Sequence, residues 1–108
     1  MAKLEKTLSG NFDDILKRIE DGVLGASISA SLEDSCDWQS ERSRCSIRVF
    51  ERYSYAGGNR VSMSVTLYQT GNDIKLCAIT SGGSQGVFFK FNTWGEETFL
   101  ETLADILP

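Results

Sequence analysis

Residues 80–108 have the sequence TSGGSQGVFFKFNTWGEETFLETLADILP, and this stretch decides the predicted fold. Its first five residues predict a turn, and the alternating residues 85–91 predict a strand after it. Thr93 and Glu96 have the spacing of a capping box, in which each side chain satisfies a backbone N–H at the start of a helix. A helix is therefore expected from this box almost to Pro108, and its apolar stripe must cover a sheet.

Upstream, the period of the apolar residues separates one helix from several strands. Apolar residues follow Asn11 at helical spacing, and Asn11 itself is a favourable N-cap. Residues 33–43 are polar and charged with little periodicity, which predicts a loop anchored only by Trp38. The remaining segments alternate with a period of two and predict strands at residues 3–8, 26–32, 44–55, 61–68 and 74–79.

These elements predict an α+β fold with the order β-α-β-β-β-β-α, which leaves room for one further short strand. Short turns between successive strands give one antiparallel sheet, and two amphipathic helices bury their stripes on one of its faces. The expected architecture is a two-layer sandwich with the other sheet face open. A length of 108 residues suits one core, so residues 1–108 are expected to form a single α+β domain. The predicted core includes Leu16, Ile19, Val65, Leu67, Phe89, Leu100 and Leu103.

Composition and charge argue against several classes of function. The chain is 41% hydrophobic and 24% charged, as in soluble globular proteins, and it begins without a signal-peptide pattern, so we expect a cytoplasmic protein with no membrane partner. It has no histidine, the commonest general base, and its three cysteines are expected to be free thiols. The net charge of −4 argues against nucleic acid as a partner. No cofactor, metal site or catalytic residue is predicted.

The strand at residues 44–55 carries the feature most indicative of function. Its alternation places Cys45, Ile47 and Val49 on one side, and we expect these apolar residues to face the helices. The arginines on the opposite side would then lie on the open face with aromatic residues of neighbouring strands, an arrangement suited to anionic ligands or stacked bases. The candidate ligand-binding residues are Arg44, Arg48, Phe50, Arg52, Tyr68, Lys75, Phe88 and Lys90.

Several functions remain open for this face. The basic and aromatic residues would suit an anionic small molecule, the aromatic residues would suit a homodimer, and a solvated sheet face would have neither role. We expect a non-enzymatic binding or interaction module. The alternative is a small enzyme without histidine that acts on an anionic small molecule. The acidic and thiol groups of residues 34–45 match no class of metal site and are expected to lie in a solvated loop.

Four short segments carry a resemblance to a known family. They are residues 50–54 (FERYS), 58–62 (GNRVS), 82–85 (GGSQ) and 89–97 (FKFNTWGEE). With them the chain resembles a small family of uncharacterised bacterial proteins, a domain of unknown function seen mainly in Firmicutes. The resemblance covers nearly the whole chain and is strongest after Phe50. It implies a bacterial, cytoplasmic protein and assigns no activity and no site.

Overall fold

The computed structural model describes residues 1–54, 59–82 and 89–108, with side chains for all of these except residues 89–94. Its elements follow the predicted order β-α-β-β-β-β-α, which confirms the α+β fold class. They are β1 (Ala2–Leu8), α1 (Phe12–Gly25), β2 (Ser31–Gln39), β3 (Ser43–Ser54), β4 (Asn59–Thr70), β5 (Asp73–Gly82) and α2 (Phe89–Ile106).

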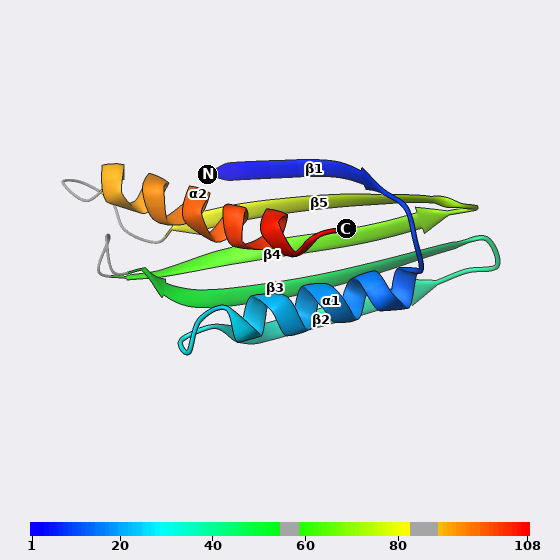
Figure 1. The fold of residues 1–108 in the computed structure, drawn as a ribbon, viewed down its shortest axis with the longest axis horizontal. Helices are drawn as coiled ribbons and strands as arrows, with labels where there is room; N and C mark the ends of the chain where they lie inside the picture. The colour runs from blue at the N-terminus through cyan, green and yellow to red at the C-terminus, as the bar shows by residue number, and fades with distance from the viewer. Residues whose placement is uncertain (55–58, 83–88) are drawn as a thin grey trace.

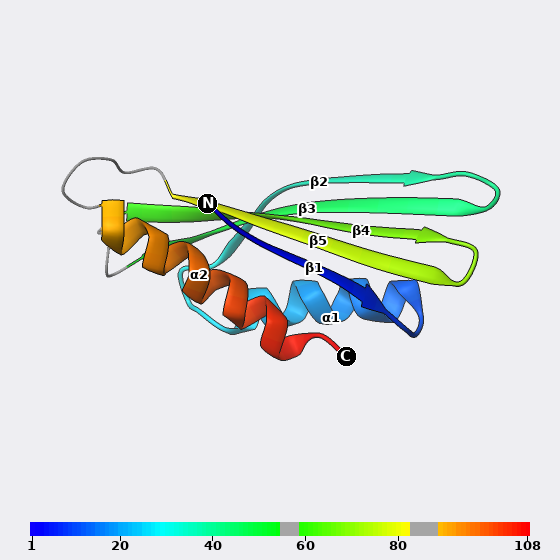
Figure 2. The same ribbon diagram turned by 90° about the horizontal axis from the view of Figure 1, so that it is seen from above.

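The five strands form one antiparallel sheet in the order β1-β5-β4-β3-β2. Strand β1 lies at one edge of the sheet, beside β5, and β2 lies at the other edge. Helix α1, which joins β1 to β2, therefore connects the two edges. Both helices lie on the same face, with α2 over β4 and β5 and α1 over β2 and β3 (Figure 1). The view from above shows that neither helix lies over the other face and that no described element covers it (Figure 2). The predicted two-layer sandwich with one open face is therefore confirmed. Neither helix, within the described residues, combines the length and apolar character needed to cross a membrane.

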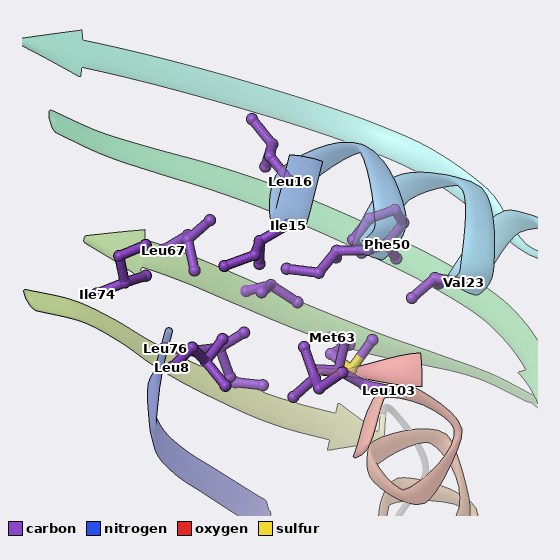
Figure 3. Packing of buried hydrophobic residues seen from close by; sticks show 14 of the residues in the cluster. Leu8, Ile15, Leu16, Val23, Phe50, Met63, Leu67, Ile74, Leu76 and Leu103 are labelled. Atoms are coloured by element: carbon purple, nitrogen blue, oxygen red, sulfur yellow. The ribbon is translucent and has the colours of Figure 1, made fainter. Parts of the chain in front are cut away.

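The core lies between the sheet and the two helices (Figure 3). Alternate residues of β4 and β5 point into it, and α1 contributes residues at the helical spacing expected from the sequence. The prediction is correct for Leu16, Ile19, Val65, Leu67 and Leu103, while Leu100 is only partly buried and the side chain of Phe89 lies outside the described part.

Helix α1 begins and packs as its sequence predicts. The side chain of Asn11 accepts a hydrogen bond from the Asp14 N–H at 3.0 Å, so Asn11 is the N-cap. Gly22 allows α1 to approach α2 closely, because a Cβ at this position would lie 3.1 Å from Cβ of Ile106. The Arg18 side chain donates a hydrogen bond to the Ile106 carbonyl oxygen, which ties the last turn of α2 to α1.

The predicted loop at residues 33–43 is wrong, because most of it forms the edge strand β2. An edge strand that is exposed along nearly its whole length needs no apolar alternation, and backbone pairing with β3 holds it in place. Its acidic residues are of the kind that keep edge strands from pairing with other chains. The strand predicted at 26–32 is also misplaced, since only residues 31 and 32 belong to β2.

The predicted start of the last helix is wrong as well. Helix α2 begins at Phe89, so Thr93 lies inside it and is no N-cap, and residues 89–91 are helical rather than extended. The rest of the predicted strand, residues 85–88, lies outside the described part. Glu96 is buried and accepts a hydrogen bond from the Gly82 N–H at 2.9 Å, and it also lies 2.6 Å from the amino group of Met1. Its carboxylate thus fixes α2 to the sheet.

Candidate interaction surface

Strand β3 has the opposite orientation to the one predicted. Phe50 is fully buried and Arg48 is 8% exposed, both on the helix side of the sheet, whereas Ile47 and Val49 lie on the open face. The prediction failed because it assigned the arginines to solvent. In the structure Arg44 and Arg48 lie on the side of the sheet that faces the helices, where they form ion pairs with acidic residues of α1 and β2.

Arg48 is the centre of this ionic contact between layers. Its guanidinium donates to Glu20 of α1 at 3.2 Å and to Asp37 of β2 at 3.0 and 3.3 Å. Asp37 also accepts a hydrogen bond from the Ser46 hydroxyl at 2.6 Å. The hydrogen bonds from Ser46 and then Arg48 hold the pKa of Asp37 below its usual value, so this carboxylate is charged in the folded protein.

The other two arginines of β3 pack against helix aromatics. The Arg44 guanidinium lies 4.1 Å from the ring centroid of Phe12 and pairs with Asp13 at 2.9 Å. Arg52 lies 4.4 Å from the ring centroid of Phe99, and burial lowers its pKa. Arg44, Arg48, Phe50 and Arg52 therefore lie on the helix side of the sheet, where the arginines pair with acidic residues or stack on aromatic rings of the helices.

Of the predicted ligand-binding residues whose side chains the structure describes, two meet on the open face. Tyr68 of β4 and Lys75 of β5 are directly paired and both are exposed. Phe88 lies outside the described residues, and Lys90 belongs to helix α2 rather than to a strand, with its side chain outside the described part. The predicted basic and aromatic cluster is thus divided between the two layers.

Strand register arranges the open face in three complete rows, each with one residue from every strand. We call these fifteen residues the open-face rows. In the strand order β1-β5-β4-β3-β2, they are Thr7-Lys75-Tyr68-Cys45-Trp38, then Glu5-Cys77-Thr66-Ile47-Cys36, then Lys3-Ile79-Ser64-Val49-Asp34.

The open-face rows are apolar for a solvated surface and electrically balanced. Trp38 is 67% exposed, Tyr68 42% and Ile79 40%, and Ile47 and Val49 are half-buried beside them. The charged residues of the rows are two lysines and two carboxylates, Lys3, Lys75, Glu5 and Asp34. Next to the rows, Arg60 already pairs with Glu51 at 2.9 Å. A neutral surface with exposed rings and aliphatic groups is typical of a protein contact rather than of an anion site.

Two shallow hollows flank Tyr68 on this surface. One lies over β1, β5 and β4 and is lined mainly by Thr7, Thr66, Lys75 and Cys77 together with Tyr68. The other lies beside Trp38 near the β2–β3 turn, and Cys45 contributes to it. We call the first of them the Lys75 hollow. Both are open and shallow, and within the described residues no group of three or more cysteines and acids is placed to hold a metal ion.

The comparison with protein families assigns the chain as a whole. A family model covers the chain over residues 1–108. The chain belongs to a family of unknown function, DUF6054. Membership confirms the resemblance at the level of an uncharacterised domain family, and the bacterial source stays a prediction. No curated protein matches the DUF6054 chain.

All three thiols of the DUF6054 chain lie on the open face, where Cys36 is exposed and Cys45 and Cys77 are half-buried. Burial, followed by the nearby Cys36 and Asp37, raises the pKa of the Cys45 thiol, so Cys45 is protonated at neutral pH and is a poor nucleophile. The prediction that Cys45 faces the helices is wrong, as it is for Ile47 and Val49, because the two faces of β3 are exchanged relative to the prediction. Sequence analysis missed Trp38, Ile47 and Val49 as surface residues. For Trp38, the signal in the sequence was a single tryptophan in an otherwise polar segment.

Proposed function

We propose that the DUF6054 chain is a non-enzymatic interaction module that forms a homodimer through its open sheet face. The observation that carries the proposal is the surface of the open-face rows, which exposes Trp38, Tyr68 and Ile79 on the side of the sheet opposite α1 and α2. Burial of such groups against a second surface releases free energy that hydration does not supply.

The size of the face agrees with a stable dimer. Five strands at a spacing of about 4.8 Å, with 7 to 12 residues each and ten on average, give a face of roughly 24 by 33 Å, or about 800 Å². A standard protein–protein interface buries about 800 Å² on each partner. Two copies packed face to face would reproduce the aligned, rather than the orthogonal, packing of sheets in β-sandwiches.

The charges favour a second copy over an anion. The arginines that would have attracted an anion are paired with Asp13, Glu20 and Asp37 or stacked on Phe99, on the helix side. The open-face rows have two charges of each sign, so two copies can meet without net repulsion.

The proposal is tested by placing a charge in the centre of the face. Ile79→Glu should weaken the dimer by roughly 100-fold or more, because association would remove the new carboxylate from water. Lys3 is the β1 neighbour of Ile79, so the new carboxylate has a cation beside it in the monomer and the fold should be kept. Sedimentation equilibrium over a range of concentrations measures the effect.

Leu24→Glu is the matched control. Leu24 is 37% exposed against 40% for Ile79, but it lies on α1 in the helix layer. The control variant should dimerise like the unchanged chain, and the dimer should persist at high salt because apolar burial drives it. An unchanged chain that sediments as a monomer at every concentration, or equal effects of the two substitutions, would overturn the proposal.

A second expected result concerns the thiols. Alkylation of Cys45 and Cys77 should slow as protein concentration rises, since both lie within the face that dimerisation covers. In the Ile79→Glu variant the alkylation rate should not depend on concentration. Mass spectrometry after a timed pulse of alkylating reagent measures the rate at each cysteine. Concentration-independent rates in a chain that does dimerise would show that another surface forms the dimer.

A further inference from the structure

The two-fold symmetry of a homodimer restricts how the open-face rows of two copies can meet. This step rests on the homodimer proposed above. In a face-to-face dimer the two-fold axis lies in the plane between the two sheets, and a residue on the axis contacts its own copy. Residues on the axis should therefore be uncharged, because like charges placed against each other weaken association.

An axis that runs across the strands along any one of the three rows fails this condition. Along the first row it would place Lys75 against the partner's Lys75, and along the second row Glu5 against the partner's Glu5. Along the third row both Lys3 and Asp34 would meet their own copies. Each of these arrangements brings like charges together.

An axis along β4 satisfies the condition. The row residues of β4 are Ser64, Thr66 and Tyr68, all uncharged, and β4 is the middle strand of the five. Strand β3 is uncharged in the rows as well, but an axis along it would leave β1 without an opposing strand. Of the axes that run along a strand or along a row, the one along β4 combines neutral self-contacts with overlap of the whole sheet.

The axis along β4 also matches opposite features of the two copies. It exchanges β1 with β2 and β5 with β3, so Lys3 at one end of the third row faces the partner's Asp34 at the other end. In the same row, Ile79 faces the partner's Val49. Trp38, the most exposed aromatic residue of the rows, faces the strands that form the Lys75 hollow.

We infer that the DUF6054 dimer has its two-fold axis along β4, with Trp38 of each copy seated in the partner's Lys75 hollow and Lys3 of each copy paired with the partner's Asp34. Trp38 is then the anchor of the interface, since a tryptophan buried in a pocket is the commonest kind of hot spot. The Lys75 ammonium lies at the wall of the hollow, where it can contact the face of an indole ring.

Charge reversal tests the axis without disturbing the core, since Lys3 and Asp34 are both exposed. The Lys3→Glu and Asp34→Lys variants should each dimerise roughly tenfold more weakly than the unchanged chain, because each homodimer contains two like-charge contacts. A mixture of the two variants should form a heterodimer of near-normal affinity, because both contacts in it join opposite charges. Native mass spectrometry of variants with tags of different mass measures the proportions.

The anchor is tested separately with Trp38→Ala, which should weaken the dimer roughly 30-fold, as expected for a hot-spot residue. Tyr53→Ala is the matched control, because Tyr53 is an aromatic residue on the same face that lies beyond the three rows. The control should change the dissociation constant less than about threefold.

These outcomes test the position of the axis separately from the existence of the dimer. Preferential heterodimers together with a selective loss in Trp38→Ala would support the axis along β4. If the unchanged chain dimerises and Ile79→Glu prevents it, but the charge-reversal variants show no preference for one another, the axis is wrong and the proposed function stands. If the unchanged chain is a monomer, both are overturned.

Discussion

Replacement of Phe50 with alanine is expected to lower the free energy of unfolding by about 3–5 kcal/mol, the usual cost of truncating a buried phenylalanine. Phe50 is fully buried on the helix side of β3, in the core beneath α1 (Figure 3). Its neighbour Val49 lies on the open face and is half-buried, so Val49→Ala should cost no more than about 1 kcal/mol in the monomer. Urea denaturation of the two variants, at a concentration where the chain is monomeric, measures both values.

The comparison of these two variants tests the orientation of β3 directly. A shift of one residue in a strand exchanges its two faces, so the two orientations predict opposite orders of stability. If Val49→Ala cost more than Phe50→Ala, the orientation inferred from the alternation of Cys45, Ile47 and Val49 would be correct. The arginines would then lie on the open face, and the homodimer proposed through it would lose its basis.

The parts of the fold that were predicted correctly are those in which one-sided burial leaves a periodic pattern. Helix α1 has apolar residues at helical spacing and a local N-cap at Asn11, and β4 alternates strictly between Val61 and Leu67. Because these elements bury only apolar groups, the sequence period alone fixes which face is inside. The antiparallel pairing of the successive strands β2 to β5 then follows from the turns between them, and the helices cover the apolar face.

Prediction failed where burial depends on a partner distant in sequence. Arg48 is buried because Glu20 and Asp37 are close to it, and neither neighbour is evident from the alternation within β3. The signal was present in the uneven distribution of charge, since the acidic residues of α1 and the arginines of β3 are complementary between layers. Edge strand β2 left no pattern, because it buries almost nothing.

The candidate site was predicted only in part for the same reason. Tyr68 and Lys75 were placed correctly, because β4 and β5 alternate clearly. Trp38 and Ile47 were missed because their strands were assigned wrongly, one as a loop and the other with its faces exchanged. Correction of these two errors changes the predicted surface from a basic one to a neutral, apolar one. The change favours a second copy of the chain as the occupant.

Arg48→Ala is expected to lower the free energy of unfolding by about 2–3 kcal/mol. The substitution removes a side chain that is 9% exposed and leaves the carboxylates of Glu20 and Asp37 without their shared cation. Asp37 is 59% exposed and Glu20 31%, so water can solvate them again, and the loss should be smaller than for a fully buried pair. Arg60→Ala is the matched control: Arg60 pairs with Glu51 at a similar distance but is 46% exposed, and its loss should cost less than about 1 kcal/mol.

The stabilising effect of Arg48 should also depend on pH in a defined direction. The pKa of Asp37 is lowered in the folded state, first by the hydrogen bond from Ser46 and then by that from Arg48. A lowered pKa means that Asp37 stabilises the fold above its usual pKa, and that this stabilisation is lost as the pH falls toward the folded-state value. The difference in stability between the unchanged chain and Arg48→Ala should therefore be largest near neutral pH and shrink in acid.

Urea denaturation measures this difference at neutral pH and at about pH 3, a pH close to the usual pKa range of aspartate. A difference that stays constant with pH would mean that Arg48 stabilises the fold by packing its hydrocarbon chain, and that the ionic contact between the layers contributes little.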